Sequence, residues 1–172
     1  FKLIELNKKY KFIKSNTKLL DIGAYPGGWA QVASKVVKTG KILSLDTKKM
    51  EKLDNVSFLQ CDFLEERAKE KILKFFREKL DVVISDMAAN TTGNKSLDCI
   101  RTNQLCAEVV EFSSKILKPN GVLVSKLFMG DDFLEVKELA KSKFKKVDFF
   151  KPEASRSESK ETYIHCALLK TL

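Results

Sequence analysis

The sequence predicts an α/β protein of the doubly wound, Rossmann-like class, with a seven-stranded, mostly parallel sheet and helices on both faces. Short apolar runs alternate with segments of helical periodicity, which is the pattern of a parallel sheet covered on both sides. A glycine-rich turn follows the first apolar run, where such sheets bind nucleotides. The 172 residues suit one domain, 1–172, because no repeat or flexible linker interrupts the pattern.

The individual elements follow from the same alternation. Strands are predicted at 18–21, 41–46, 56–59, 81–85, 121–128, 146–150 and 162–169, and helices at 2–10, 29–37, 65–79, 97–117 and 132–144. The last two strands are separated by a segment without a helical pattern, so we expect them to pair antiparallel. In the longest helix, Ile100 and Ile116 belong to an apolar face that should cover the sheet, and residues 118–121 should end the helix.

Residues 21–29 read D-I-G-A-Y-P-G-G-W and have the composition of a cofactor loop. Gly23 and Gly27 allow sharp turns and a close approach of the backbone to a ligand, and Trp29 opens the next helix. A dinucleotide loop needs glycine at its third position, where this chain has Tyr25. This difference argues against a nicotinamide-dependent dehydrogenase.

Acidic residues at the ends of the next strands narrow the choice of cofactor. Asp46 follows the second apolar run, 23 residues after Gly23, about where a carboxylate binds a ribose. Asp62 follows the third run and could accept a hydrogen bond from an adenine amino group. A cofactor with a ribose but no pyrophosphate fits this set best, which predicts S-adenosylmethionine. The alternative is that both aspartates cap helices.

Lys126 lies inside the apolar run V-L-V-S-K-L-F, where burial of an ammonium group is costly. A lysine there either pairs with a carboxylate for structure or serves a function. Asp86, directly after the fourth strand, is the expected partner because both residues lie at the carboxyl end of the sheet.

Composition sets further expectations. The net charge of +9 suggests a polyanionic partner such as nucleic acid, although 28 of the 32 basic residues are lysines and codon bias would give the same excess. Four scattered cysteines indicate reduced thiols and no metal site. No long apolar run is present, which predicts a cytoplasmic protein without a membrane partner; an organellar location stays open if a targeting segment precedes Phe1.

Taken together, these residues resemble the FtsJ-type family of ribosomal RNA 2′-O-methyltransferases over nearly the whole chain. The stretches that carry the resemblance are F-K-L at 1–3, D-I-G-A-Y-P-G-G-W at 21–29, S-D-M-A-A-N at 85–90, V-S-K-L-F at 124–128 and K-P-E-A-S-R-S-E-S-K-E-T-Y at 151–163. The resemblance implies a catalytic tetrad at Lys2, Asp86, Lys126 and Glu161, and cofactor contacts at Gly27, Trp29, Asp46, Asp62 and Asp86. Tyr25 and Ala89 depart from the family pattern without removing a functional group.

The resemblance also implies a monomer that methylates a ribose in large-subunit ribosomal RNA, within the subunit or as free RNA. Lys126 is expected to act as the base that activates the 2′-hydroxyl, or to stay charged and only position it. Asp86 should orient Lys126, and Glu161 should hold Lys2 unless the two form an ordinary surface ion pair. Lys2 and Arg156 are expected to contact RNA. Transfer RNA or an mRNA cap remain alternative substrates, and a non-catalytic RNA-binding module is the alternative class.

Overall fold

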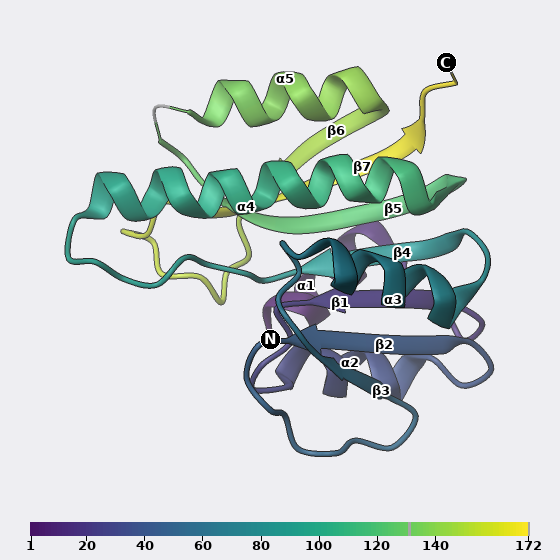
Figure 1. Ribbon diagram of the computed structural model, residues 1–172. Coiled ribbons are helices and arrows are strands. Elements are labelled where there is room, and N and C mark those ends of the chain that lie inside the picture. Colours follow the sequence, from purple (N-terminus) through teal and green to yellow (C-terminus); the bar gives the residue numbers. More distant parts are fainter. Residues whose placement is uncertain (131, 172) are drawn as a thin grey trace.

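The computed structural model describes residues 1–130 and 132–171 and shows one sheet between two layers of helices (Figure 1). The elements are, in chain order, α1 (Lys2–Tyr10), β1 (Lys18–Ile22), α2 (Gly28–Val36), β2 (Lys41–Asp46), β3 (Ser57–Gln60), α3 (Glu66–Phe76), β4 (Leu80–Ser85), α4 (Lys95–Ile116), β5 (Leu117–Phe128), α5 (Phe133–Lys143), β6 (Phe144–Phe150) and β7 (Glu161–Leu169). None of the helices in the described ranges is long and apolar enough to cross a membrane.

The seven strands lie in the order β3-β2-β1-β4-β5-β7-β6. The pairs β1–β2, β1–β4, β2–β3 and β4–β5 are parallel, whereas β7 runs antiparallel to both β5 and β6. This arrangement confirms the predicted fold class, including the antiparallel pairing of the last two strands. The carboxyl ends of the parallel strands therefore meet at one edge of the sheet, where loops bind ligands in such folds.

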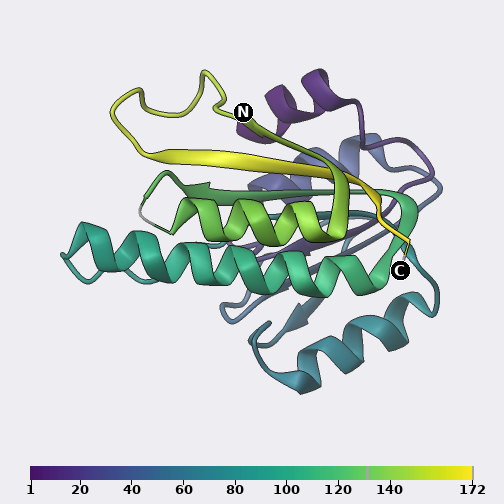
Figure 2. The ribbon, with the colours of Figure 1, turned by 90° about the horizontal axis from the view of Figure 1, so that it is seen from above.

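The two faces of the sheet have separate cores, and Figure 2 shows the helices on either side of the strands. One core joins α1 and α2 to the sheet through buried side chains that include Leu3, Leu6 and Ala33. The other core lies beneath α3, α4 and α5 and includes Ile72, Val109 and Ala140. Strand residues that alternate between these cores are apolar on both faces, which explains the continuous apolar runs in the sequence.

Two details differ from the sequence-based expectations. Residues 118–121 lie within β5, which pairs Leu117 with Leu80 and, after a register shift, Val122 with Val82. The strand therefore begins directly after α4 rather than after a turn. Ile100 is 37% exposed rather than buried against the sheet, and the first turns of α4 project beyond the neighbouring α5 (Figure 2).

Candidate active site

Two residues of the loop between β1 and α2, Gly23 and Gly27, have positive φ angles that favour glycine. Gly23 has a φ of +72°, and a Cβ there would lie 2.3 Å from Cγ of Met87. The amides of Gly23 and Ala24 both donate to the carbonyl of Leu45, at 2.9 and 3.0 Å, which fixes the loop against β2. The loop therefore turns over the carboxyl ends of β1 and β2, as the sequence predicted for a cofactor loop.

Asp46 and Asp62 lie beside this loop, and neither of them caps a helix. Asp46 accepts hydrogen bonds from the amides of Tyr25 (to Oδ2, 2.8 Å) and Lys48 (to Oδ1, 2.9 Å). Asp62 accepts from the amide of Leu64 at 2.9 Å, whereas α3 begins later, with Glu65 at its N-cap. Because a carboxylate offers about four acceptor sites, both aspartates keep acceptor capacity for a ligand.

Asp21, the first residue of the predicted cofactor loop, lies within β1 and is a buried carboxyl group. It is 1% exposed, and its Oδ2 accepts from the hydroxyl of Ser44 at 3.1 Å. Its Oδ1 has no hydrogen-bond partner among the described residues. Burial raises the pKa of Asp21 to about 7; the Ser44 hydrogen bond opposes this rise, and the nearby carboxylates of Asp86 and Asp46 add to it.

The four residues of the expected tetrad form one connected network of charges. Lys2 Nζ lies 2.6 Å from Glu161 Oε1. Lys126 Nζ lies 3.2 Å from Asp86 Oδ1 and 3.4 Å from Glu161 Oε2. The side chains of Lys126 and Glu161 are each 12% exposed and that of Lys2 is 31% exposed, so Lys2 pairs with a largely buried carboxylate that Lys126 also contacts. Two ammonium groups and two carboxylates balance in charge, which lowers the cost of their burial.

Strand register and helix docking bring these four side chains together from distant parts of the chain. Pairing of β4 with β5 sets Ser85 beside Ser125, so the next residues, Asp86 and Lys126, lie side by side. Lys2 is the first residue of α1. The carboxylate of Glu5 accepts hydrogen bonds from the amides of residues 153 and 154, at 2.7 and 2.9 Å, and this contact ties α1 to the loop before β7.

Tyr163 belongs to the same network, although the sequence analysis assigned it no role. Its hydroxyl donates to Asp86 Oδ1 at 2.6 Å and lies 3.3 Å from Glu161 Oε1, and the residue is fully buried. Its ring centroid lies 5.5 Å from that of Trp29, which connects the network to the start of α2. Strand alternation could have identified Tyr163, because it lies two residues after Glu161 and therefore on the same face.

The network fixes the ionisation of two of its members. Burial disfavours a charged Glu161, but the hydrogen bond from Lys2 and the charges of Lys126 and Lys2 outweigh burial and lower the pKa of Glu161. Burial, followed by the negative charges of Asp86 and Glu161, raises the pKa of Tyr163 well above its usual range. Glu161 is therefore a carboxylate at neutral pH, and Tyr163 is a permanent hydrogen-bond donor.

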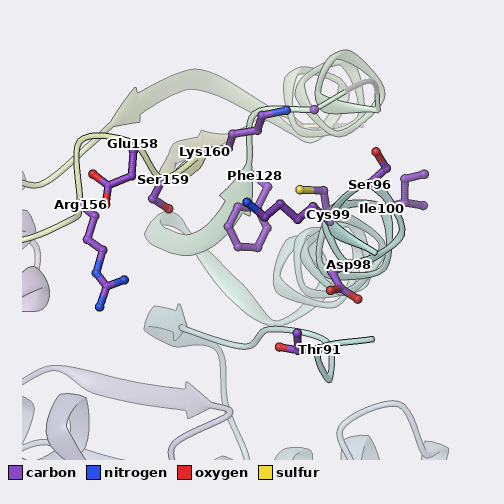
Figure 3. Close-up of a pocket in the computed structure, with 12 residues that line it drawn as sticks. Thr91, Ser96, Asp98, Cys99, Ile100, Phe128, Arg156, Glu158, Ser159 and Lys160 are labelled. Carbon is purple, nitrogen blue, oxygen red and sulfur yellow. The ribbon is translucent and has the colours of Figure 1, made fainter. Parts of the chain in front are cut away.

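The remaining predicted residues lie at the edge of the network or away from it. Arg156 is exposed on the loop between β6 and β7 and lines a cavity next to the network (Figure 3). His165 is a buried residue of β7, and its ring stacks on that of Tyr10 with 3.8 Å between centroids. Of the cysteines, Cys61, Cys106 and Cys166 are buried and Cys99 is half-buried, all as free thiols.

Comparisons with known proteins agree with this geometry. The sequence matches the family described as FtsJ-like methyltransferase over residues 1–168. It is 45% identical over 170 residues to a protein of Pelagibacter ubique named Ribosomal RNA large subunit methyltransferase E, covering 99% of this chain and 84% of that protein.

Solved structures show the same fold. The crystal structure of a protein described as a ribosomal RNA methyltransferase from Plasmodium falciparum superposes with a TM-score of 0.86 at 30% identity, covering 98% of this chain and 94% of that one. Human methyltransferase-like protein 13, crystallised with SAH, gives a TM-score of 0.68 at 15% identity, with coverages of 95% and 82%. The family match over almost the entire length places this chain in the FtsJ-like methyltransferase family.

Proposed function

We propose that this protein transfers a methyl group from S-adenosylmethionine to a ribose 2′-hydroxyl of RNA, and that its substrate is large-subunit ribosomal RNA. The observation that carries the proposal is the partly buried network of Lys2, Glu161, Lys126 and Asp86 at the strand ends next to the glycine loop. The choice of RNA is supported by the name of the Pelagibacter ubique relative and by the net charge of +9.

The residues around the loop fit S-adenosylmethionine. A Cβ at Gly28 would meet no atom within 4 Å, so the start of α2 is open to a ligand. Asp46 Oδ2 accepts one hydrogen bond, from Tyr25, and its remaining lone pair suits a ribose hydroxyl. We assign cofactor contacts to Gly23, Gly27, Trp29, Asp46, Asp62 and Asp86. S-adenosylmethionine supplies an electrophilic methyl group on a sulfonium centre and leaves as S-adenosylhomocysteine.

The tetrad residues then act on the ribose. A 2′-hydroxyl is a weak acid and a poor nucleophile, so the attack of its oxygen benefits from a base and from in-line placement. In our proposal Lys126 enters the step as a neutral amine, after releasing a proton to solvent, and takes the hydroxyl proton while the new O–C bond forms and the bond between the methyl carbon and sulfur breaks. Asp86 and Glu161 hold its Nζ in place from two sides. Lys2, bound to Glu161, presents a positive charge to the RNA together with Arg156.

One experiment tests the whole proposal. The purified protein is incubated with S-adenosylmethionine labelled in its methyl group and with large ribosomal subunits from cells that lack this methylation. We expect label at one nucleotide of the large-subunit RNA, with the phosphodiester bond after it resistant to alkali, as 2′-O-methylation requires. Label on a base, or label in transfer RNA or capped mRNA instead, would contradict the proposal.

Because one chain supplies all four tetrad residues, we further propose that the enzyme acts as a monomer. We place this monomer in the cytoplasm. Sedimentation of the active protein tests whether it is a monomer.

A further inference from the structure

A cavity of about 490 Å³ lies at the end of β5, and its lining includes Phe128, two residues after Lys126, but none of the four tetrad residues. Its walls come from the first turns of α4, the end of β5 and the loop between β6 and β7 (Figure 3). Phe128 lies in its centre, with Arg156 and Ser159 on one side and Cys99 and Ile100 on the other. The volume is in the range of small-ligand sites, about 300–1,000 Å³.

The cavity begins one residue pair beyond the tetrad. Phe128 follows Lys126 by two positions on β5, so both side chains leave the same face of the strand, about 7 Å apart along it. Phe128 also pairs directly with Glu161 on β7. The amide of Met129 donates to the carbonyl of Lys160 at 2.9 Å and holds the cavity wall against the end of β5. A group bound over Phe128 therefore lies next to Lys126.

The chemical character of the lining suits a nucleobase better than a bare phosphate. Phe128 offers an aromatic ring, on which bases stack. Cations lie beside carboxylates in the lining, which contains Lys95, Arg156, Lys160, Asp98 and Glu158. The amide and hydroxyl of Thr92 donate to Asp98 Oδ1 at 3.0 and 2.8 Å, so this carboxylate is held in place. Carboxylates repel a phosphate but accept hydrogen bonds from the N–H groups of a base edge.

We propose that the cavity holds the base of the nucleotide that is methylated, stacked on Phe128, with Arg156 and Lys160 toward its flanking phosphates. The inference rests on the proposed function and deepens it. Methyl transfer requires that the 2′-oxygen of one ribose lies in line with the methyl group. Binding of the base attached to that ribose restricts how the ribose can rotate. RNA recognition commonly uses unpaired bases splayed onto aromatic side chains, so the enzyme accepts a nucleotide turned out of its stack.

Variants of the protein provide the first half of the test. The substrate is large ribosomal subunits that lack the methylation. Phe128→Leu keeps an apolar side chain but removes the aromatic face, and we expect a ten- to hundredfold loss of kcat/KM, the range expected for one base–aromatic stack. Phe128→Tyr keeps an aromatic ring and should retain most of the wild-type kcat/KM. S-adenosylmethionine affinity and Tm should not change in either variant. Phe75→Leu, in a half-buried phenylalanine on α3, is the matched control and should keep wild-type kcat/KM.

Modified substrates provide the second half. Large subunits are reconstituted with a synthetic RNA fragment that has an abasic residue either at the methylated position or at the nucleotide on each side, with every ribose retained. We expect the abasic residue at the methylated position to lower kcat/KM of the wild-type protein about as much as Phe128→Leu does, with no further loss when the two are combined. A loss confined to a neighbouring abasic position, or additive losses, would overturn the inference. Methylation of unmodified subunits by the wild-type protein tests the proposed function separately.

Discussion

The hydroxyl of Tyr163 donates to Asp86, with 2.6 Å between Oη and Oδ1, and its second neighbour is Glu161 Oε1 at 3.3 Å. This buried hydroxyl connects a carboxylate that follows β4 to one at the start of β7, across the intervening strand β5. The raised pKa of Tyr163, caused first by burial and then by these carboxylates, keeps it a donor. The positions of both acids therefore depend on one phenol that does not itself need to touch the substrate.

Replacing this phenol tests that dependence. Tyr163→Phe keeps the packing against Trp29 but leaves Asp86 without its shortest hydrogen bond, and hydrogen bonds to charged groups contribute about 1.5–3 kcal/mol. We expect a lower free energy of unfolding in urea and a several-fold drop in single-turnover methylation. Tyr10→Phe is the matched control, because the buried hydroxyl of Tyr10 has no partner among the described residues; its stability should be equal or higher. Equal effects of the two substitutions would contradict the role of Tyr163.

The pH dependence of stability should carry a contribution from Asp21. Its pKa is raised to about 7, chiefly by burial, whereas an unfolded aspartate titrates near 3.9. The folded state therefore binds the extra proton, and the stabilisation present at low pH is lost as pH rises from about 4 to 7. Asp21→Asn should remove this slope and be more stable than the wild type at pH 8, by at most a few kcal/mol. Urea unfolding of the cofactor-free proteins at pH 5 and pH 8 measures the difference; parallel slopes would exclude Asp21 as its origin.

The shape of the cofactor loop should depend on Gly23. Gly23→Ala forces a residue with a Cβ to a φ of +72°, with Met87 Cγ only 2.3 Å away, and such strain costs about 1–3 kcal/mol. We expect a lower Tm and weaker S-adenosylmethionine binding by calorimetry. In Gly28→Ala the new Cβ meets no atom within 4 Å, and alanine favours the helix, so its Tm should not fall. If the Gly23→Ala protein is as stable as the Gly28→Ala protein, the loop accommodates the new Cβ and its shape does not depend on Gly23.

Lys2 should stabilise Glu161 in its charged form. Burial opposes the charge of Glu161, yet the hydrogen bond from Lys2 and the nearby ammonium groups lower its pKa. This contribution is present above the unfolded value of about 4.3 and is lost as pH falls through the folded pKa. Lys2→Met should therefore destabilise the protein at pH 6, and the difference from the wild type should shrink toward pH 3. Lys8→Met changes an exposed position of the same helix. Its difference in stability from the wild type should not shrink toward pH 3.

The order of the strands and most of the tetrad could be predicted because both depend on local chemistry. Continuous apolar runs indicate strands buried on both faces, and Lys126 stood out because a lysine within such a run is costly. The end of the longest helix was predicted within one residue, at 117 against Ile116, but the start of the next strand was harder to predict. The turn-forming residues 118–121 lie in an irregular stretch of β5 that still pairs at Leu117, so tertiary pairing overrides the local turn preference.

Other features depend on contacts between segments that are distant in the sequence, and a local sequence pattern does not reveal such contacts. Ile100 has the spacing of a buried helix face, yet it is 37% exposed. Strand alternation places Tyr163 on the same face as Glu161, but its position opposite Lys126 depends on the pairing of β7 with β5. Asp21 ends an apolar run like many strand residues, and its burial and its contact with Ser44 of the neighbouring strand depend on how the strands pair.

Lys126 is proposed to be the base that activates the 2′-hydroxyl. Side-by-side measurements on two variants test this role. We compare Tm, S-adenosylmethionine affinity and single-turnover methylation of large subunits for Lys126→Ala and Lys126→Arg. Loss of a positioned base costs about a hundred- to ten-thousandfold in rate, so Lys126→Ala should fold, bind the cofactor and lose methyl transfer by that factor. Lys126→Arg keeps the charge but cannot give up its proton; it should be equally inactive if Lys126 is the base. Substantial activity in Lys126→Arg would reduce its role to positioning, and wild-type turnover by a folded Lys126→Ala protein would contradict the account.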